Sequence, residues 1–160
     1  NRAHLARWEP AYPDGFFTHA YWEKRLDDAR QELIDDEALR LVLFRRGDAE
    51  GRAIGVINVT AIVRLAFNCC NLGYSLDAEH MHQGLMREGL GAAITHVWGE
   101  LRLHRIQANY QPNNERSGRL LERLGFEIEG YARDYLLIDG AFRDHILTSL
   151  THPDWTPASS

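Results

Sequence analysis

One stretch, from Asn71 to Glu100, constrains the fold more than any other part of the chain. Residues 71–76 form a compact apolar run typical of a strand, and residues 77–83 are polar without periodicity, as in a loop. Apolar residues then recur at helical spacing, which predicts a helix that begins at Gly84. The free amides of a helix start carry a partial positive charge, and a glycine there lets a ligand come close. This unit suits a phosphate or pyrophosphate, although a turn without a ligand has a similar sequence.

Length and composition limit what the chain can be. We expect residues 1–160 to form one domain, with residues 151–160 as a C-terminal tail without periodicity. A net charge of −5 argues against a nucleic-acid-binding surface, and no apolar run reaches the roughly 18 residues of a membrane span. Cys69 and Cys70 are the only cysteines and are adjacent, which argues against a disulfide framework. We therefore expect buried, inert thiols in a cytoplasmic protein.

Periodicity and turn signals predict the remaining elements. At the start of the chain we expect an irregular segment 1–16, a helix 19–36, and strands 38–45 and 52–63 joined by the turn 47–51. The strand–loop–helix unit of residues 71–100 follows. We then expect a strand 104–111, a helix 115–124, and strands 126–138 and 142–150 joined by Asp139–Gly140. The strand–helix–strand units require parallel pairing in the middle, and the hairpins require antiparallel pairing at both ends. The fold class is therefore α/β, a mixed sheet with helices on both faces. Trp22 and Trp98 fall on apolar helix faces and are expected in the core.

The expected ligand site follows from this topology. Ligands in such sheets bind at the carboxyl ends of strands, where neighbouring strands diverge. Leu76 and Gln111 end the two central parallel strands, so we expect the site to lie between them.

Two motifs carry a resemblance to a known family. QGLM at 83–86, and PNNERSGRLLERLGFEIEGY at 112–131, resemble the GNAT acetyltransferase superfamily and, within it, the RimJ/RimL-type N-acetyltransferases of ribosomal-protein N-termini. The C-terminal half is most similar to the ribosomal-protein-alanine members. The opening NRAHLARWEP is also similar to that branch, where it follows a first strand and helix, so we expect those two elements to precede this sequence. The resemblance implies a GNAT-like mixed sheet.

The resemblance also implies acetyl-CoA as the cofactor. Its pantetheine arm is expected along the strand before the loop, and its pyrophosphate on the loop and helix start. Carried onto this sequence, the cofactor-binding residues are Tyr74, Ser75, Leu76, His82, Gln83, Gly84, Leu85, Met86 and Arg87. Met81 departs from the family motif, which has Gln or Arg there.

Asn114 and Ser117 match the P-x-N-x-x-S pattern of this branch. Their spacing places both on one face of a helix start. The resemblance implies that Asn114 binds the cofactor arm and that Ser117 lies beside the thioester sulfur as proton donor. Without it, a helix cap and an exposed serine are the simpler interpretation.

Acetyl transfer to an amine needs a neutral nucleophile and a proton for the departing thiolate. The RimL branch has a glutamate at the position of Leu136, and this chain has no carboxylate there. In an unbroken strand, Glu129, Tyr131 and Tyr135 share one face and Asp134 lies on the other. We expect Asp134, or a water that it holds, to be the base. Tyr135 and Tyr110 are secondary candidates for the proton donor, and Glu129 is expected to be structural.

These observations predict an acetyl-CoA-dependent N-acetyltransferase that acts on a protein N-terminus, with a basic ribosomal protein starting with alanine as the expected partner. An acetyltransferase of small amines, such as an antibiotic or a polyamine, and a non-catalytic acyl-CoA-binding or ribosome-associated module are the alternatives. We expect a monomer or homodimer that binds neither nucleic acid nor a membrane. His80 and His82 are two histidines without a third ligand, so no metal is expected.

Overall fold

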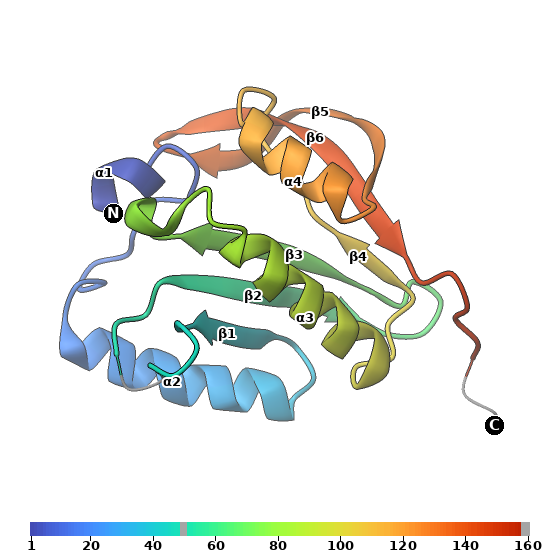
Figure 1. Ribbon diagram of the computed structural model, residues 1–160, viewed down its shortest axis with the longest axis horizontal. Coiled ribbons are helices and arrows are strands. Elements are labelled where there is room, and N and C mark those ends of the chain that lie inside the picture. The colour runs from blue at the N-terminus through green and yellow to red at the C-terminus, as the bar shows by residue number, and fades with distance from the viewer. Residues whose placement is uncertain (49–50, 158–160) are drawn as a thin grey trace.

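A six-stranded mixed sheet forms the centre of the protein, in the strand order β1-β2-β3-β4-β6-β5 (Figure 1). The computed structural model describes residues 1–48 and 51–157. Its elements are α1 (Arg2–Leu5), α2 (His19–Ile34), β1 (Leu39–Leu43), β2 (Gly55–Val63), β3 (Cys69–Leu76), η1 (Ala78–His80), α3 (Leu85–Gly99), β4 (Arg105–Gln107), α4 (Glu115–Arg123), β5 (Glu127–Ile138) and β6 (Ala141–Thr151). The predicted mixed sheet is confirmed.

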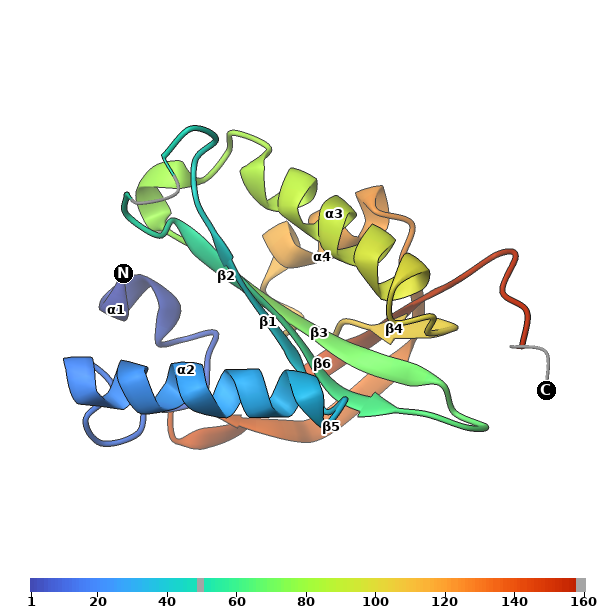
Figure 2. The ribbon, with the colours of Figure 1, turned by 90° about the horizontal axis from the view of Figure 1, so that it is seen from below.

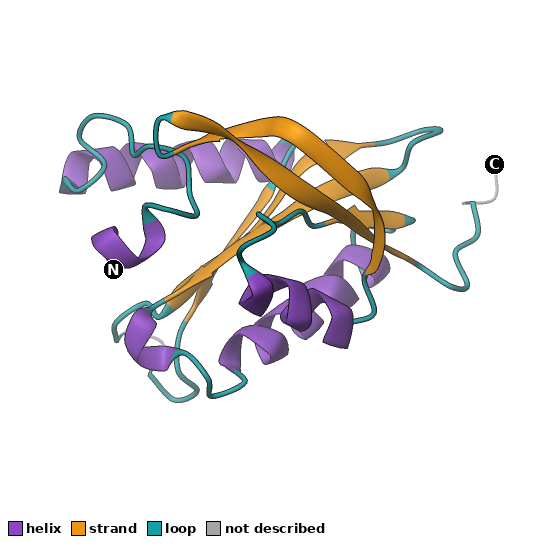
Figure 3. Ribbon diagram, turned by 90° about the horizontal axis from the view of Figure 1, so that it is seen from above, coloured by secondary structure: helices purple, strands orange, loops and turns teal. Residues whose placement is uncertain are grey.

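Helices cover both faces of the sheet. Figures 2 and 3 show α3 and α4 on one face and α2 on the other. The apolar core lies between the sheet and α3 and α4, and its fully buried members include Ile57, Leu90, Val97, Ile106 and Leu121. No helix among the described residues is long and apolar enough to cross a membrane.

The two parallel strands separate soon after they pair. β3 and β4 are parallel over three residue pairs, from Cys69↔Arg105 to Asn71↔Gln107. Beyond that point β3 continues to Leu76 beside β2. The chain after β4 turns instead to β6, where Tyr110 forms an antiparallel bridge with Ile146. The strands diverge from their paired end, as predicted (Figure 1), and we call the interval between their ends at Leu76 and Gln111 the opening.

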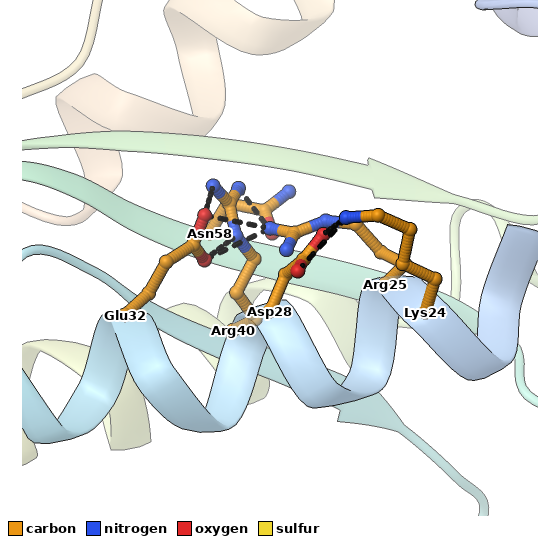
Figure 4. A network of polar contacts seen from close by, with 6 residues as sticks. All are labelled: Lys24, Arg25, Asp28, Glu32, Arg40 and Asn58. Atoms are coloured by element: carbon orange, nitrogen blue, oxygen red, sulfur yellow. Dashed lines mark hydrogen bonds and ion pairs between the residues drawn. The ribbon is translucent and has the colours of Figure 1, made fainter.

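Charged side chains hold α2 against the sheet (Figure 4). Glu32 lies between Arg25 and Arg40, with shortest N···O distances of 2.9 and 2.8 Å. Arg40 also donates to Oδ1 of Asn58 on β2, at 3.3 Å. The hydrogen bonds from Arg40, and then those from Arg25, lower the pKa of Glu32 to about 2. The helix is thus attached through a partly buried ion network.

The expectation that Trp22 lies in the core is wrong. Trp22 is 43% exposed, Leu26 and Leu33 are also exposed, and α2 contains no buried residue. The reason is that α2 directs its Arg25 and Glu32 side to the sheet. Trp98 does pack against the core, as predicted.

Other differences are local. The segment expected to be irregular contains α1, the expected loop contains η1, and the strand expected over 104–111 is regular only in β4, because the chain then crosses to β6. The strands expected over 38–45 and 52–63 are shorter, and part of the turn between them, residues 49–50, lies outside the described residues. The Asp139–Gly140 turn is confirmed, with positive φ at both residues (50° and 73°).

Both cysteines are buried in β3, as predicted. Cys70 is fully inaccessible and Cys69 is 3% exposed, and both are free thiols. Burial raises the pKa of Cys70 to about 12 and raises that of Cys69 as well.

Replacing Glu32→Gln should lower the free energy of unfolding at pH 7 by about 1–2 kcal/mol, because two arginines lose their anionic partner. The depressed pKa of Glu32 means that this stabilisation is present above pH 4.5 and is lost as the pH falls toward about 2. Urea unfolding at pH 7 and at pH 3 measures both effects.

The matched control is Glu23→Gln, which removes an exposed partner of His19 on the same helix and should change stability by less than about 0.5 kcal/mol. Equal effects of the two substitutions would contradict the role given to the Glu32 network.

Candidate active site

The loop after β3 is anchored by Asp77, which is 6% exposed. Its Oδ1 accepts the amide of Glu79 at 3.0 Å, and its Oδ2 pairs with Arg52 at 3.0 Å. The amide of Asp77 also donates to the carbonyl of Ile54, which ties the loop to the segment before β2. The backbone hydrogen bond from Glu79, more than the nearby charge of Arg52, lowers the pKa of Asp77. These contacts fix the path from the end of β3 to the start of α3.

The start of α3 is open to a ligand. Gly84 is the N-cap and has a left-handed backbone with φ 79°, and no side chain caps the helix. A Cβ added at this glycine would meet no atom within 4 Å. The space beside Gly84 is therefore open, and the partial positive charge of the first-turn amides can bind a phosphate there.

The expected cofactor-binding residues meet at one end of the opening. The main chain of Tyr74, Ser75 and Leu76 pairs with β2 on one side and, beyond the β4 pairing, has its other edge free. His82 has a left-handed backbone (φ 62°) in the turn before the helix. Met86 is buried in the core, so only its amide can contribute to binding. A free strand edge beside free helix amides fits the pantetheine and pyrophosphate of the expected cofactor.

A hydroxyl pair spans the opening. Tyr74 Oη and Ser117 Oγ lie 2.7 Å apart, which joins β3 to the first turn of α4. The side chain of Asn114 accepts the amide of Ser117 at 3.3 Å, so Asn114 is the helix cap that the sequence also allowed. Burial raises the pKa of Tyr74 to about 12, so this hydroxyl stays protonated at neutral pH.

Gly118 lets Tyr110 lie close to α4. A Cβ at Gly118 would lie 2.9 Å from the ring and the hydroxyl of Tyr110. The side chain of Tyr110 therefore occupies the space next to Ser117, on the α4 face of the sheet. Tyr110 packs against the core, which makes a structural role its main one.

The expected arrangement of β5 is wrong in part. Register shifts between Ile128 and Gly130, and again between Ala132 and Leu136, interrupt the alternation that an unbroken strand would have. Tyr131 therefore contacts Asp144, whereas the ring of Tyr135 lies beside His145. Asp144 and His145 are consecutive residues of β6 and point to opposite faces, so the two tyrosines lie on opposite faces as well.

The candidate bases and donors on β5 differ in their surroundings. The Asp134 side chain is exposed, its φ is 49°, and its amide donates to Asp144 at 2.9 Å. Glu129 pairs with Arg105 and accepts from Ser149, which supports the structural role expected of it. The structure places Tyr74 against Ser117, and Tyr135 lies across the sheet from this pair. The sequence identified Tyr74 only for its main chain. Strand alternation places the side chain of Tyr74 on the core face, and those of its neighbours Gly73 and Ser75 on the other face.

Among the residues that the structure describes, no three His, Cys, Asp or Glu side chains lie close enough together to hold a metal ion. His80 Nδ1 lies 3.8 Å from Asp77 Oδ2, which is too far for a hydrogen bond.

Comparisons with known proteins agree with this geometry. The family profile described as an acetyltransferase (GNAT) domain matches residues 1–127. The chain is 47% identical over 157 residues to the ribosomal protein uS5-alanine N-acetyltransferase of Escherichia coli (strain K12), which covers 98% of this chain and 80% of the relative. The predicted family resemblance is confirmed.

Two solved structures share the fold closely. A ribosomal-protein-S5-alanine acetyltransferase from Vibrio fischeri has a TM-score of 0.92 at 40% identity and covers 98% of this chain and 85% of its own. RimJ from Mycobacterium smegmatis, solved in complex with CoA-disulfide, has a TM-score of 0.84 at 28% identity. The match covers 94% of this chain and 71% of the Mycobacterium smegmatis chain.

Replacing Gly118→Ala should destabilise the protein by about 1–3 kcal/mol, because the added methyl group would displace the Tyr110 ring. Thermal unfolding measures the loss. The matched control is Gly91→Ala in α3, where an added Cβ meets nothing within 4 Å and the higher helix propensity of alanine should preserve or raise stability. A Gly118→Ala protein as stable as the control would refute this packing constraint.

Proposed function

Because the chain belongs to the GNAT acetyltransferase family, we propose that it transfers acetyl directly to the N-terminal α-amine of a ribosomal protein that starts with alanine. The protein is an acyltransferase and its cofactor is acetyl-CoA. The acceptor is inferred from the Escherichia coli relative, which is named for ribosomal protein uS5. An acceptor of this kind would be met in the cytoplasm.

The residues around the opening support direct transfer. Acetyl-CoA, when bound, supplies the acetyl group as a thioester. The free edge of Tyr74–Leu76 and the first-turn amides of α3 would hold its arm and pyrophosphate, and Asn114 would contact the arm at the head of α4. Ser117 Oγ, held by the protonated Tyr74 hydroxyl, can donate a proton to the leaving sulfur. The 2.7 Å hydroxyl pair at the opening is the observation that carries the proposal.

The acidic groups of β5 and β6 favour an α-amine as the acceptor. Hydrogen bonds from Arg105 lower the pKa of Glu129, and the hydrogen bond from Tyr131 lowers that of Asp144. Both carboxylates are therefore weaker bases than usual. An α-amine, with a pKa of about 7.7–8.0, is partly neutral at cellular pH and needs only a weak base, unlike a lysine-type amine near 10.4. Exposed Asp134, or a water that it holds, is the base that we propose.

Acetyl-CoA turnover should be seen with peptides whose free N-terminus is alanine. The same peptides with blocked N-termini should be inactive, because the α-amine is the nucleophile. Release of CoA measures turnover across a panel that also contains spermidine and an aminoglycoside. Turnover with the small amines alone would overturn the proposed acceptor in favour of a small-molecule enzyme.

Replacing Ser117→Ala should lower kcat by about tenfold or more while the Kd for acetyl-CoA is retained, because the proton donor is lost and the binding surfaces remain. Thr95→Ala is a control, since its hydroxyl bonds the carbonyl of Gly91 within α3 and should not affect kcat. Equal kcat values for the two variants would exclude Ser117 as the donor.

Asp134→Asn should lower kcat/KM for the peptide, because an amide side chain cannot take the proton from the amine. An unchanged kcat/KM would exclude this carboxylate as the base.

A further inference from the structure

Asn109 lies at the opening, on the face opposite the cofactor. It follows the last β4 residue paired with β3, Gln107, by two positions. Its neighbours Ala108 and Tyr110 belong to the core packed under α3 and α4. Because side chains alternate along an extended chain, Asn109 points to the other face of the sheet. Ser117 and the start of α3 occupy the first face, so we place the amine that attacks the thioester on this second face, which α2 also covers.

The amide group of Asn109 is held from both ends. The main-chain N–H of Thr148 donates to its Oδ1 at 3.1 Å, and its Nδ2 donates to the hydroxyl of Tyr135 at 3.2 Å. A backbone N–H can only donate, so the atom that it meets must be the amide oxygen. The nitrogen must therefore face the tyrosine, and the orientation of the Asn109 side chain is determined by the backbone of β6.

This orientation directs the proton of the Tyr135 hydroxyl. The amide nitrogen of Asn109 cannot accept a hydrogen bond, so the tyrosine proton must point away from it. The ring of Tyr135, on β5, rests beside the buried His145 of β6, with ring centroids 5.4 Å apart. Tyr135 is 41% exposed, and its hydroxyl has no further hydrogen bond among the described residues. The hydroxyl is thus a prearranged donor on the second face.

We propose that Asn109 is a positioning residue that aims the Tyr135 hydroxyl at the acceptor, and that this hydroxyl donates a hydrogen bond to a main-chain carbonyl of the acceptor peptide. The assignment rests on the proposed function and deepens it, since a simple amine offers no carbonyl and would not use this donor. In this proposal Tyr135 does not protonate the leaving sulfur, because the sulfur would lie with Ser117 on the first face.

The test compares Tyr135→Phe and Asn109→Asp with the unaltered protein, using a peptide that begins with alanine. Asn109→Asp keeps the shape of the side chain and its contact with Thr148, but a carboxylate only accepts, so the tyrosine proton turns inward. Each variant should raise the KM for the peptide about two- to tenfold, the effect of one hydrogen bond, while kcat and the KM for acetyl-CoA stay unchanged. The double variant should be no worse than Tyr135→Phe, because Asn109 acts through that hydroxyl.

Tyr131→Phe is the matched control. It removes a tyrosine hydroxyl from the same strand, but one that bonds Asp144, and it should leave both KM values unchanged. If the unaltered protein acetylates the peptide and the two test variants keep its peptide KM, or if their effects simply add, the positioning role is overturned and the proposed function stands. If the unaltered protein does not acetylate the peptide, the proposed function and this inference both fall.

Discussion

The loss of pairing between β3 and β4 after three residues is the constraint on which the site depends. Because β3 stays with β2 and the chain after β4 joins β6, the edge of Tyr74–Leu76 that faces away from β2 is left without a strand partner. A free strand edge normally favours pairing with other chains and aggregation, but this edge lies beside the uncapped amides of α3. Main-chain groups of both elements are thus available to the cofactor in the proposed site. Met81, where the family motif has Gln or Arg, is consistent with binding through main-chain groups.

The two faces of the sheet are stabilised by different forces. Apolar packing attaches α3 and α4, whose buried residues include Leu90 and Leu121. The ion pair between Glu32 and Arg40 attaches α2 to β1, and α2 itself buries no residue. The α3–α4 face therefore keeps its geometry through close packing, which resists small displacements. The α2 face has a polar attachment, in which opposite charges pair with each other.

The sequence predicted the fold better than it predicted the side-chain contacts. The apolar run at 71–76, the glycine at 84 and the Asp139–Gly140 turn each have one physical interpretation, and all three agree with the structure. Trp22 was misjudged because helical periodicity identifies an apolar stripe without saying whether the sheet meets it. The faces of β5 were misjudged because register shifts leave no reliable mark in the sequence.

Long-range side-chain contacts were beyond sequence reasoning for a similar reason. The Tyr74–Ser117 pair joins residues 43 positions apart, and Asn109 and Tyr135 are 26 apart. Strand alternation could have shown that Tyr74 faces the core side. The packing of α4 on the sheet brings the first pair together, and the strand order and register bring the second pair together.

The burial of Cys69 and Cys70 has a practical consequence. Thiol reagents attack the thiolate, and these thiols are inaccessible and have raised pKa values. Ellman-type reagents should thus respond to CoA released in solution and leave the folded protein unmodified. The 160-residue sequence contains no other cysteine. Its turnover can therefore be followed continuously by absorbance, and one cysteine introduced on the surface would give a single labelling position for fluorescence.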